Sequence, residues 1–415
     1  MPPYRRAFVI ICLLAPLFYI YWRKLWAPNT LDGLSGRFLL SEDVLNSTLG
    51  FSKIFVINLP ARTDRRDAMA LVGAVSNLSF TWIDGVSSDQ LSASDRIVSG
   101  NRKGHYAGAI GSWKSHMKAL EAIVEANLES ALVMEDDVDW DVRLKSQLQT
   151  FASASKTWLR ESRSYRRSGE EDLLDFVPPS PFGKRGGTTT DFEDSDSSNT
   201  IPLSTTKAGL DSNTKSVYGD GWDVLWLGHC GADLSYKSSH VSPLKVAIFG
   251  DETVPAPKHL KPHPFALLDK LGEVHPPHTR VVHASSGNVC SLAYAVSQAG
   301  ARKLLRRFNA NFETQWDLVL QRWCEGGYVT EEGDPQAGPG EVAPVCLTVQ
   351  PPLISHHYSK DGASNIQAQG GGFAKGTGTP YIRISTRENL QRLVAGVPRE
   401  QLVDQLPDDG KTIWR

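Results

Sequence analysis

The stretch SALVMEDDVDWD, residues 130–141, places five carboxylates within seven residues directly after an apolar run. Adjacent carboxylates repel one another unless a cation or solvent screens them. One interpretation is a solvated loop that follows a buried strand. The other is a divalent-cation site at the carboxyl edge of a sheet, where α/β proteins bind ligands. The five acids are Glu135, Asp136, Asp137, Asp139 and Asp141.

The composition excludes one class of partner. The 415 residues include 44 basic and 46 acidic side chains, which nearly cancel. This balance gives no electrostatic reason to expect nucleic acid as a partner. It still allows an anionic small molecule to be bound by a few arginines.

The elements around the acidic cluster alternate between strand and helix patterns. Strands are predicted at residues 53–59, at residues 80–85 and in the apolar run before the acids, and each is followed by a helical pattern. In the second of these helices, Ser112 is the expected N-cap. Alternation of this kind predicts an α/β fold with a mixed, mainly parallel sheet. A later helix is expected to be capped by Ser297.

Three stretches interrupt this pattern. Residues 161–216 are rich in Ser, Thr, Pro, Gly and Asp, and we expect a disordered insertion within one catalytic domain of residues 51–360. Residues 236–280 are expected to be irregular, and the C-terminal tail, residues 361–415, is expected to pack little from residue 370 on. Four cysteines outside the N-terminal apolar run can form two disulfides in three ways. They are Cys230, Cys290, Cys324 and Cys346.

The N-terminus predicts membrane attachment. Residues 7–22 are uncharged and are flanked by basic residues on both sides. Such a run favours a retained anchor within residues 1–26 over a cleaved signal peptide, followed by a stem at residues 27–50. Sequons at Asn46 and Asn77 agree with a lumenal catalytic part. We therefore expect an endoplasmic reticulum or Golgi membrane protein.

Several of these segments occur together in one known family. FVINLPARTDRR, GAIGSWKSHMKAL, ALVMEDDV, WDVLWLG, AYAVSQAGARKLL and PPLISHH stand here in the order seen in glycosyltransferase family 25, which the chain resembles over residues 53–358. The resemblance is to a membrane-anchored, fungal-type member. It implies a GT-A-like, Rossmann-like fold, a UDP-sugar donor with galactose as the first choice of sugar, and inversion at the anomeric carbon. The acceptor is left open as a glycan, a glycoprotein or a glycolipid.

The resemblance gives the acidic cluster a role. A cation stabilises the charge that develops on a leaving diphosphate, and Mn²⁺ or Mg²⁺ prefers carboxylate oxygens. Asp137 is the expected direct ligand, and Glu135 or Asp136 is expected on the ribose or on metal-bound water. His356, in the polar loop after a late strand, is a candidate to complete the metal shell, with His357 as its neighbour. Asp139 and Asp141 are expected to be solvated or capping residues.

Further candidates surround the donor. Asn58 ends the first strand, Arg62 and Arg65 follow it, and arginine can fork onto phosphate or stack on a base. Asp84 ends the second strand and joins this donor-binding set, as does Ser115 of a serine–histidine pair that matches the family. His116 of that pair is a candidate catalytic residue near the donor.

Inversion requires a base that deprotonates the acceptor hydroxyl. Asp317 stands where the family has an Asp, although Gln315-Trp316 departs from the usual Pro-Ile or Pro-Val before it, and Asp223 is the rival. Two other functions remain open at this point. One is a metal-dependent phosphodiesterase that uses the same acids, and the other is a non-catalytic carbohydrate-binding protein on the same fold.

Overall fold

The computed structural model describes nine parts of the chain, all within the unit formed by residues 40–415. The expected anchor at residues 7–22 and most of the stem lie outside these parts. Within them, no helix is both long and apolar enough to cross a membrane. The described parts are residues 42–92, 107–174 (without the side chains of 165–174), 199–205, 214–234, 242–260, 270–310, 312–328, 343–358 and 378–412.

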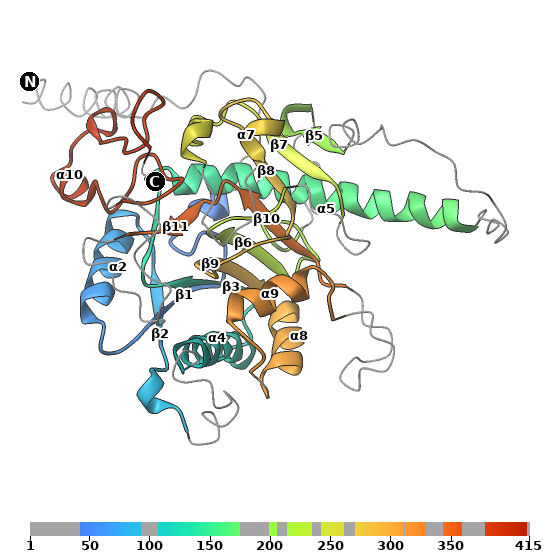
Figure 1. Ribbon diagram of the computed structural model, residues 1–415, viewed down its shortest axis with the longest axis horizontal. Helices are drawn as coiled ribbons and strands as arrows, with labels where there is room; N and C mark the ends of the chain where they lie inside the picture. The colour runs from blue at the N-terminus through green and yellow to red at the C-terminus, as the bar shows by residue number, and fades with distance from the viewer. Residues whose placement is uncertain are drawn as a thin grey trace, which may run out of the picture. The chain divides into compact units, whose positions relative to one another are not determined.

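One mixed sheet of eleven strands forms the centre of these parts (Figure 1). Its main path runs in the order β2-β1-β3-β9-β6-β10-β8-β7-β5, and β11 pairs with both β4 and β6. The strands are β1 (Lys53–Asn58), β2 (Phe80–Asp84), β3 (Ser130–Glu135), β4 (Val138–Trp140), β5 (Thr200–Pro202), β6 (Val224–Gly228), β7 (Lys245–Ile248), β8 (Arg280–Ala284), β9 (Ala293–Ser297), β10 (Cys346–Gln350) and β11 (Ile354–His356).

The strand directions bring the carboxyl ends of five strands, β1, β2, β3, β6 and β10, to one edge. β1 runs parallel to both β2 and β3, and β3 and β6 are each antiparallel to the β9 strand between them. β6 therefore runs parallel to β3, and β10 runs parallel to β6. The expected mixed α/β sheet is confirmed, and the described strand pairings divide evenly between parallel and antiparallel. The edge beyond β1, β3, β6 and β10 is where an α/β sheet binds ligands.

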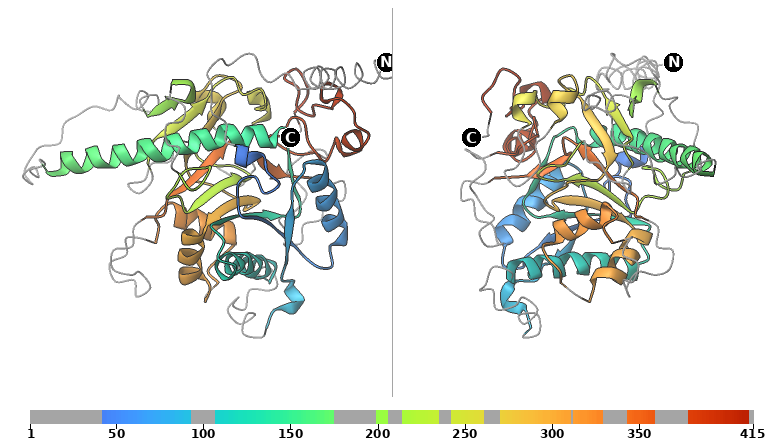
Figure 2. Two further views of the ribbon diagram at one scale, coloured as in Figure 1. Left: turned by 180° about the vertical axis from the view of Figure 1, so that it is seen from behind. Right: turned by 45° about the vertical axis from the view of Figure 1, so that its right-hand side comes forward.

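Helices cover both faces of the sheet (Figures 1 and 2). α4, α8 and α9 lie together on one face, where their apolar side chains pack on β3, β6 and β9 in one buried cluster. α5 runs along the other face. Ser297 caps α8 as expected, since its hydroxyl accepts the Gly300 N–H at 3.0 Å. The helices are α2 (Thr63–Val75), α4 (Ala107–Glu125), α5 (Leu144–Leu174), α7 (Leu271–Val274), α8 (Gln298–Phe308), α9 (Trp316–Cys324) and α10 (Leu390–Val394), with short 3₁₀ turns at Glu42–Leu45, Ser88–Gln90, Leu203–Thr205, Pro257–His259 and Arg399–Gln401.

The two stretches expected to be irregular contain regular elements. The expectation that residues 161–216 are a disordered insertion is wrong at both ends of that range. α5 continues to Leu174, and β5 pairs with β7 before residue 206. Backbone pairing explains the second end, since a short strand needs little apolar sequence of its own. The stretch at residues 236–280 likewise supplies β7, through KVAI. Residues 175–198 and 206–213 lie outside the described parts.

The four cysteines, which could form two disulfides or remain buried free thiols, form two disulfides. Cys230 pairs with Cys290, and Cys324 pairs with Cys346, which resolves the three possible connectivities. The first bond joins the turn after β6 to the loop before β9. The second joins the end of α9 to the start of β10.

The C-terminal tail was expected to pack little, and that expectation is wrong. Asp139 is fully buried, and its Oδ2 accepts hydrogen bonds from Thr379 at 2.7 Å and from the Ser385 hydroxyl. Its Oδ1 accepts the Arg387 N–H at 3.2 Å. Since the partners are hydroxyl and amide groups, the segment needs few apolar residues to pack. Asp139 was expected to be a solvated or a capping residue, and its burial shows that it is not solvated.

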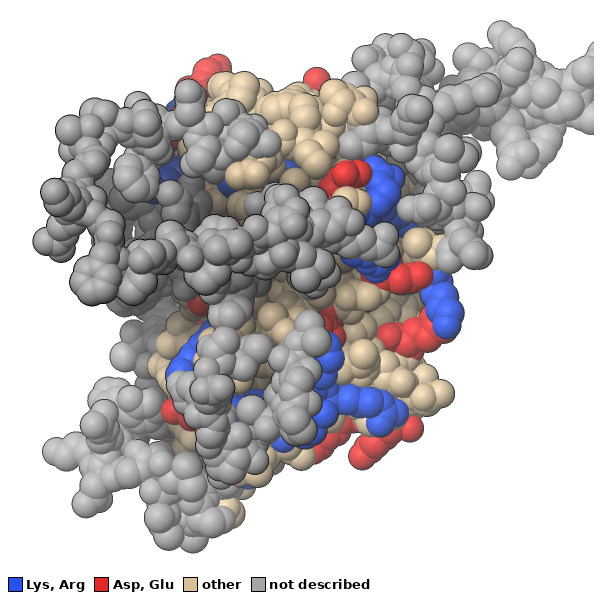
Figure 3. Space-filling model, turned by 90° about the vertical axis from the view of Figure 1, so that its right-hand side faces the viewer, with Lys and Arg blue, Asp and Glu red and all other residues tan. Residues whose placement is uncertain are grey.

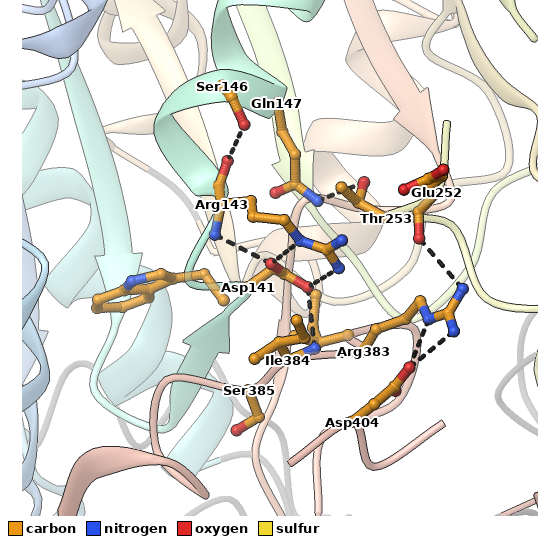
Figure 4. Close-up of polar contacts among 12 residues, drawn as sticks. Asp141, Arg143, Ser146, Gln147, Glu252, Thr253, Arg383, Ile384, Ser385 and Asp404 are labelled. Atoms are coloured by element: carbon orange, nitrogen blue, oxygen red, sulfur yellow. Dashed lines mark hydrogen bonds and ion pairs between the residues drawn. The ribbon is translucent and has the colours of Figure 1, made fainter. Parts of the chain in front are cut away.

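Asp141 binds the same segment, so it is not a solvated residue either (Figure 4). Its side chain is fully buried and forms two hydrogen bonds to the Arg143 guanidinium, at 2.7 and 2.9 Å. It also accepts the Ile384 N–H at 3.0 Å. In the same view, Arg383 of the segment pairs with Asp404 at 2.7 Å. Asp139 and Asp141 thus hold residues 378–412 against the strand that carries the acidic cluster.

α4 approaches the sheet edge closely at a glycine. Ser112 is not its N-cap, because the helix already includes Ala107. A Cβ placed on Gly111 would lie 2.3 Å from the Val86 carbonyl oxygen, which is closer than real contacts allow. Ser115, one turn on, accepts the Val86 N–H at 2.9 Å. Gly111 therefore sets the position of Ser115 and His116.

Gly111→Ala is expected to destabilise the fold by about 1–3 kcal/mol, because α4 or the loop after β2 must shift. Helix propensity alone predicts the opposite sign, a gain of about 1 kcal/mol. Chemical denaturation of the purified protein measures the difference. Ser112→Ala, at the next position of the same helix, is the control and should change stability by less than about 0.5 kcal/mol. A gain in stability for Gly111→Ala would contradict the close approach.

Asp141→Asn is expected to lower the free energy of unfolding by about 3 kcal/mol or more, because it leaves a buried arginine without its charge partner. Asp64→Asn is a matched control, since Asp64 also pairs with an arginine two residues away, Arg62, but is 64% exposed. That change should cost less than about 1 kcal/mol. Equal, small losses in the two variants would show that the C-terminal segment does not depend on Asp141.

Candidate functional site

The site begins where β1 and β3 end side by side. Asn58, the last residue of β1, is buried and donates its Nδ2 to Asp136 at 2.7 Å and to the Arg62 carbonyl at 3.1 Å. Arg65, in the first turn of α2, places Nη1 at 2.8 Å from both Asp136 and Asp137. The structure therefore brings together four residues predicted from separate motifs.

His356 approaches the same carboxylates from β11. β11 pairs antiparallel with β4 so that His356 stands opposite Val138, the residue after Asp137. Its Nε2 lies 3.4 Å from Asp137 Oδ2. The following residue, His357, donates its backbone N–H to the Asp137 carbonyl at 2.8 Å, while its ring bonds to Thr379 at 3.0 Å. Of the two histidines, His356 faces the site.

The two adjacent acids have opposite pKa shifts. Burial disfavours the charge of Asp137, but His356 and Arg65 outweigh burial and hold the pKa of Asp137 well below its usual value. Burial and the neighbouring charge of Asp137 raise the pKa of Asp136, although Arg65 opposes them. Burial likewise works against protonation of His356, but the negative charge of Asp137 raises its pKa. Asp137 is therefore the stronger acid of the two.

Arg387 completes the site from the C-terminal segment. It donates Nε to the Val138 carbonyl at 2.8 Å and Nη2 to the Asp136 carbonyl at 3.1 Å, so it fixes the backbone of the acidic turn. Burial is the main cause that lowers its pKa, and the neighbouring carboxylates oppose that shift. The sequence analysis missed Arg387, because it is one of several arginines in a polar tail and stands in no recognisable motif. The sequence indicated Arg387 only indirectly, because an acidic cluster needs basic side chains nearby.

Glu135 lies at the border of this group. Its Oε1 accepts the Ser291 hydroxyl at 3.0 Å and lies 3.8 Å from His116 Nε2. Asp317 stands close by at the start of α9, where it accepts the N–H groups of Cys290 at 2.9 Å and Leu318 at 3.0 Å. Burial is the main cause that raises its pKa. The predicted base is therefore near the acids, but both of its oxygens hold backbone groups.

Other predicted residues lie away from the acidic cluster or bond to other groups. Asp223 stands at the opposite end of β6, where it pairs with Lys303 at 2.8 Å, so the structure does not bring it to the acidic cluster. Arg62 pairs with Asp64 at 2.7 Å, and the Asp84 side chain is 71% exposed at the edge of the sheet. Ser115 is buried, and its hydroxyl donates to the Gly111 carbonyl at 2.6 Å. These contacts give Ser115 a structural role in α4.

The residues fit a hard cation only in part. Among the residues that the structure describes, no group of three or more His, Cys, Asp or Glu side chains is arranged to hold a metal ion. Asp137 Oδ1 and His356 Nδ1 are nonetheless buried atoms without a hydrogen-bond partner. Carboxylate oxygen suits Mn²⁺, and imidazole is a common ligand of divalent transition metals. Asp137 and His356 can therefore supply two ligands, and the remaining ones must come from substrate or water.

On one face of the molecule, the charged side chains of the described residues are mixed in sign. On the face drawn in Figure 3, the visible Lys and Arg side chains lie beside Asp and Glu side chains, and neither sign forms a continuous band among the described residues. The buried acids at the carboxyl edge are the stronger candidate site.

Known proteins match the part of the chain that carries the acidic run. Residues 51–206, which include β1, α4 and the whole acidic run, match the model of glycosyltransferase family 25 (LPS biosynthesis protein). Procollagen galactosyltransferase 1-B of Xenopus laevis is 29% identical over 113 residues, which are 25% of this chain. Procollagen galactosyltransferase 1 of Danio rerio is 30% identical over 112 residues, and procollagen galactosyltransferase 2 of Homo sapiens is 30% identical over 111, each 24% of this chain.

These matches are local. Each covers 18% of the relative's own length, so the chain spans less than a fifth of the curated relatives that it matches. Within the matched region the resemblance inferred from the motifs is confirmed. Over residues 51–206, the chain is similar to glycosyltransferase family 25.

Proposed function

We propose that this protein is a glycosyltransferase that moves a hexose, with galactose as the first choice, from a UDP-sugar to a hydroxyl group of a glycan, protein or lipid. One observation carries the proposal. Two adjacent carboxylates, the buried Asp136 and the half-buried Asp137, stand at the carboxyl edge of β3, held by Arg65 and facing His356, within the region that matches the family model. The names of the galactosyltransferase relatives support the choice of sugar.

The chain's own residues suit a donor with a diphosphate. When bound, Mn²⁺ or Mg²⁺ would neutralise the charge that develops on the departing diphosphate. Asp137 and His356 would hold the cation, and Arg65, already between the two acids, can turn one N–H toward a phosphate oxygen. Asn58 and Arg387 keep the acidic turn in place while Arg65 turns from the carboxylates toward the phosphate. Fixed charges cost little reorganisation at the moment of reaction.

The acceptor hydroxyl must lose its proton as its oxygen attacks the anomeric carbon and the bond to the diphosphate breaks. For inversion, we propose Asp317 as the base. Its raised pKa supports the role, because a buried carboxyl binds a proton more readily. Its two backbone contacts would have to loosen when substrate binds. Asp223 is not carried forward, because it lies at the far end of β6.

We extend the proposal to a lumenal location in the secretory pathway, with a membrane anchor at residues 7–22. Two disulfides within the described chain support an oxidising compartment. Asn46 and Asn77 of the two sequons are exposed, as glycosylation requires. Glycosidase digestion of the full chain from a eukaryotic host should increase its gel mobility.

The proposal is tested by nucleotide release from a panel of UDP-sugars, with the full chain from a secretory host, in Mn²⁺ and after chelation. Transfer to an added acceptor is measured in parallel. Release of UDP that depends on the cation supports the proposal. Hydrolysis of simple phosphodiesters without sugar transfer would instead favour the phosphodiesterase, and glycan binding without turnover would favour the carbohydrate-binding protein.

Asp137→Asn is expected to lower turnover by on the order of 10²-fold or more, because the amide cannot hold the cation by charge. Donor binding in Mn²⁺ should fall with it, and apo stability should fall as well, because the change leaves Arg65 and His356 without the charge of Asp137. Asp223→Asn is the control, a buried and ion-paired aspartate at the opposite end of β6. Per folded molecule, it should keep its turnover. Equal losses in the two variants would contradict the site.

A further inference from the structure

A buried chain of hydrogen bonds connects the core to the acidic cluster. The Trp316 indole bonds to the Tyr294 hydroxyl at 3.0 Å, and that hydroxyl bonds to His116 Nδ1 at 2.8 Å. His116 Nε2 lies 3.4 Å from the Ser291 hydroxyl, which donates to Glu135 at 3.0 Å. These five side chains, from α9, β9, α4, the loop before β9 and β3, form what we name the relay.

The first link sets the direction of the relay. An indole N–H can only donate, so the Tyr294 oxygen is the acceptor of that bond. Burial raises the pKa of Tyr294, which therefore keeps its proton. That proton needs an acceptor, and among the described residues His116 Nδ1 is the one within hydrogen-bond distance. His116 then carries its own proton on Nε2.

The last links point the same way. The Ser291 hydroxyl gives its proton to Glu135 Oε1, so its oxygen can accept the His116 Nε2–H. Every proton in the relay is thus directed toward one carboxylate oxygen. A protonated Nδ1 on His116 would leave the buried Tyr294 hydroxyl without an acceptor, which is an unfavourable arrangement. The indole ring of Trp316 also stacks on His116, with centroids 5.7 Å apart.

The burial of His116 decides what it can do. It is 1% exposed and lies beneath Glu135, whose side chain is 28% exposed. The expectation that His116 takes part in catalysis directly is therefore not supported, since substrate cannot reach it. The second oxygen of Glu135, Oε2, receives no hydrogen bond from the described residues and is the group that substrate can meet.

We propose that Trp316, Tyr294, His116 and Ser291 are positioning residues that fix Glu135 as the acceptor for a substrate hydroxyl at Oε2. The proposal rests on the proposed function, because it takes the substrate to be a nucleotide sugar. Such a donor offers hydroxyls of this kind on its ribose and on its hexose. Because Ser291 holds Oε1 of Glu135, Oε2 keeps one position. Glu135 therefore favours donors that place a hydroxyl at Oε2.

Tyr294→Phe tests the relay, because it removes one hydroxyl and leaves the ring. The control is Tyr218→Phe, since Tyr218 is also fully buried and donates its hydroxyl to a backbone carbonyl, that of Leu49 at 2.6 Å. Tyr294→Phe should weaken donor binding about tenfold, seen in the donor KM, with a smaller change in kcat. Tyr218→Phe should change the donor KM by less than about twofold at a similar loss of stability. Equal KM changes in the two variants would overturn the proposal.

Nitrogen-15 NMR of the histidine-labelled full chain gives a second readout, with the His116 signal assigned from His116→Gln. We expect a neutral ring protonated on Nε2 in the wild type, and a mixture of tautomers in Tyr294→Phe. Protonation of His116 on Nδ1, or on both nitrogens, in the wild type would overturn the relay. This readout does not need activity, so it separates failure of the relay from failure of the proposed function.

Binding of UDP, of 2′-deoxy-UDP and of the intact UDP-sugar identifies the hydroxyl. If Tyr294→Phe weakens UDP but not 2′-deoxy-UDP, Glu135 Oε2 meets the ribose 2′-hydroxyl. If only the UDP-sugar is weakened, it meets the hexose. Unchanged affinity for all three would contradict the assignment of Oε2.

Discussion

Two adjacent carboxylates cannot be buried together unless positive charge meets them, and this constraint organises the site. Asp136 and Asp137 share one nitrogen of Arg65, at 2.8 Å from each. His356 approaches Asp137, and Arg387 holds the backbone of the same turn. Because removing one partner of a buried ion pair is costly, these groups are coupled in the apo protein. A cation that binds together with the donor would enter a site where two carboxylates already favour positive charge.

The positive charges come from segments far apart in the chain. Arg65 belongs to the first turn after β1, His356 to β11 and Arg387 to the C-terminal segment. Residues 51–206, which match the family, contain the acids and Arg65 but neither of the other two. The residues of the acidic run have two different roles. Glu135, Asp136 and Asp137 face the edge of the sheet, while Asp139 and Asp141 hold residues 378–412 in place.

Much of this could be predicted from the sequence, because apolar runs mark buried strands and the ends of β1 and β3 carry the site. The predictions of Asn58, Arg65, Asp136, Asp137 and His356 as one group rested on motifs next to such strands. The C-terminal segment was missed because it packs through hydroxyl and amide contacts to buried aspartates, which leave no apolar period. Asp223 was misplaced because a sequence does not say which end of a strand faces the ligand.

The central claim is that Asp137 and His356 bind the cation together with the donor diphosphate. Pulsed electron paramagnetic resonance of Mn²⁺, added with UDP to the full chain, measures it directly. The account predicts modulation from one histidine nitrogen and from phosphorus, and loss of the nitrogen modulation in His356→Gln while phosphorus remains. Mn²⁺–UDP bound without any histidine nitrogen, or with a nitrogen that persists in His356→Gln, would contradict it.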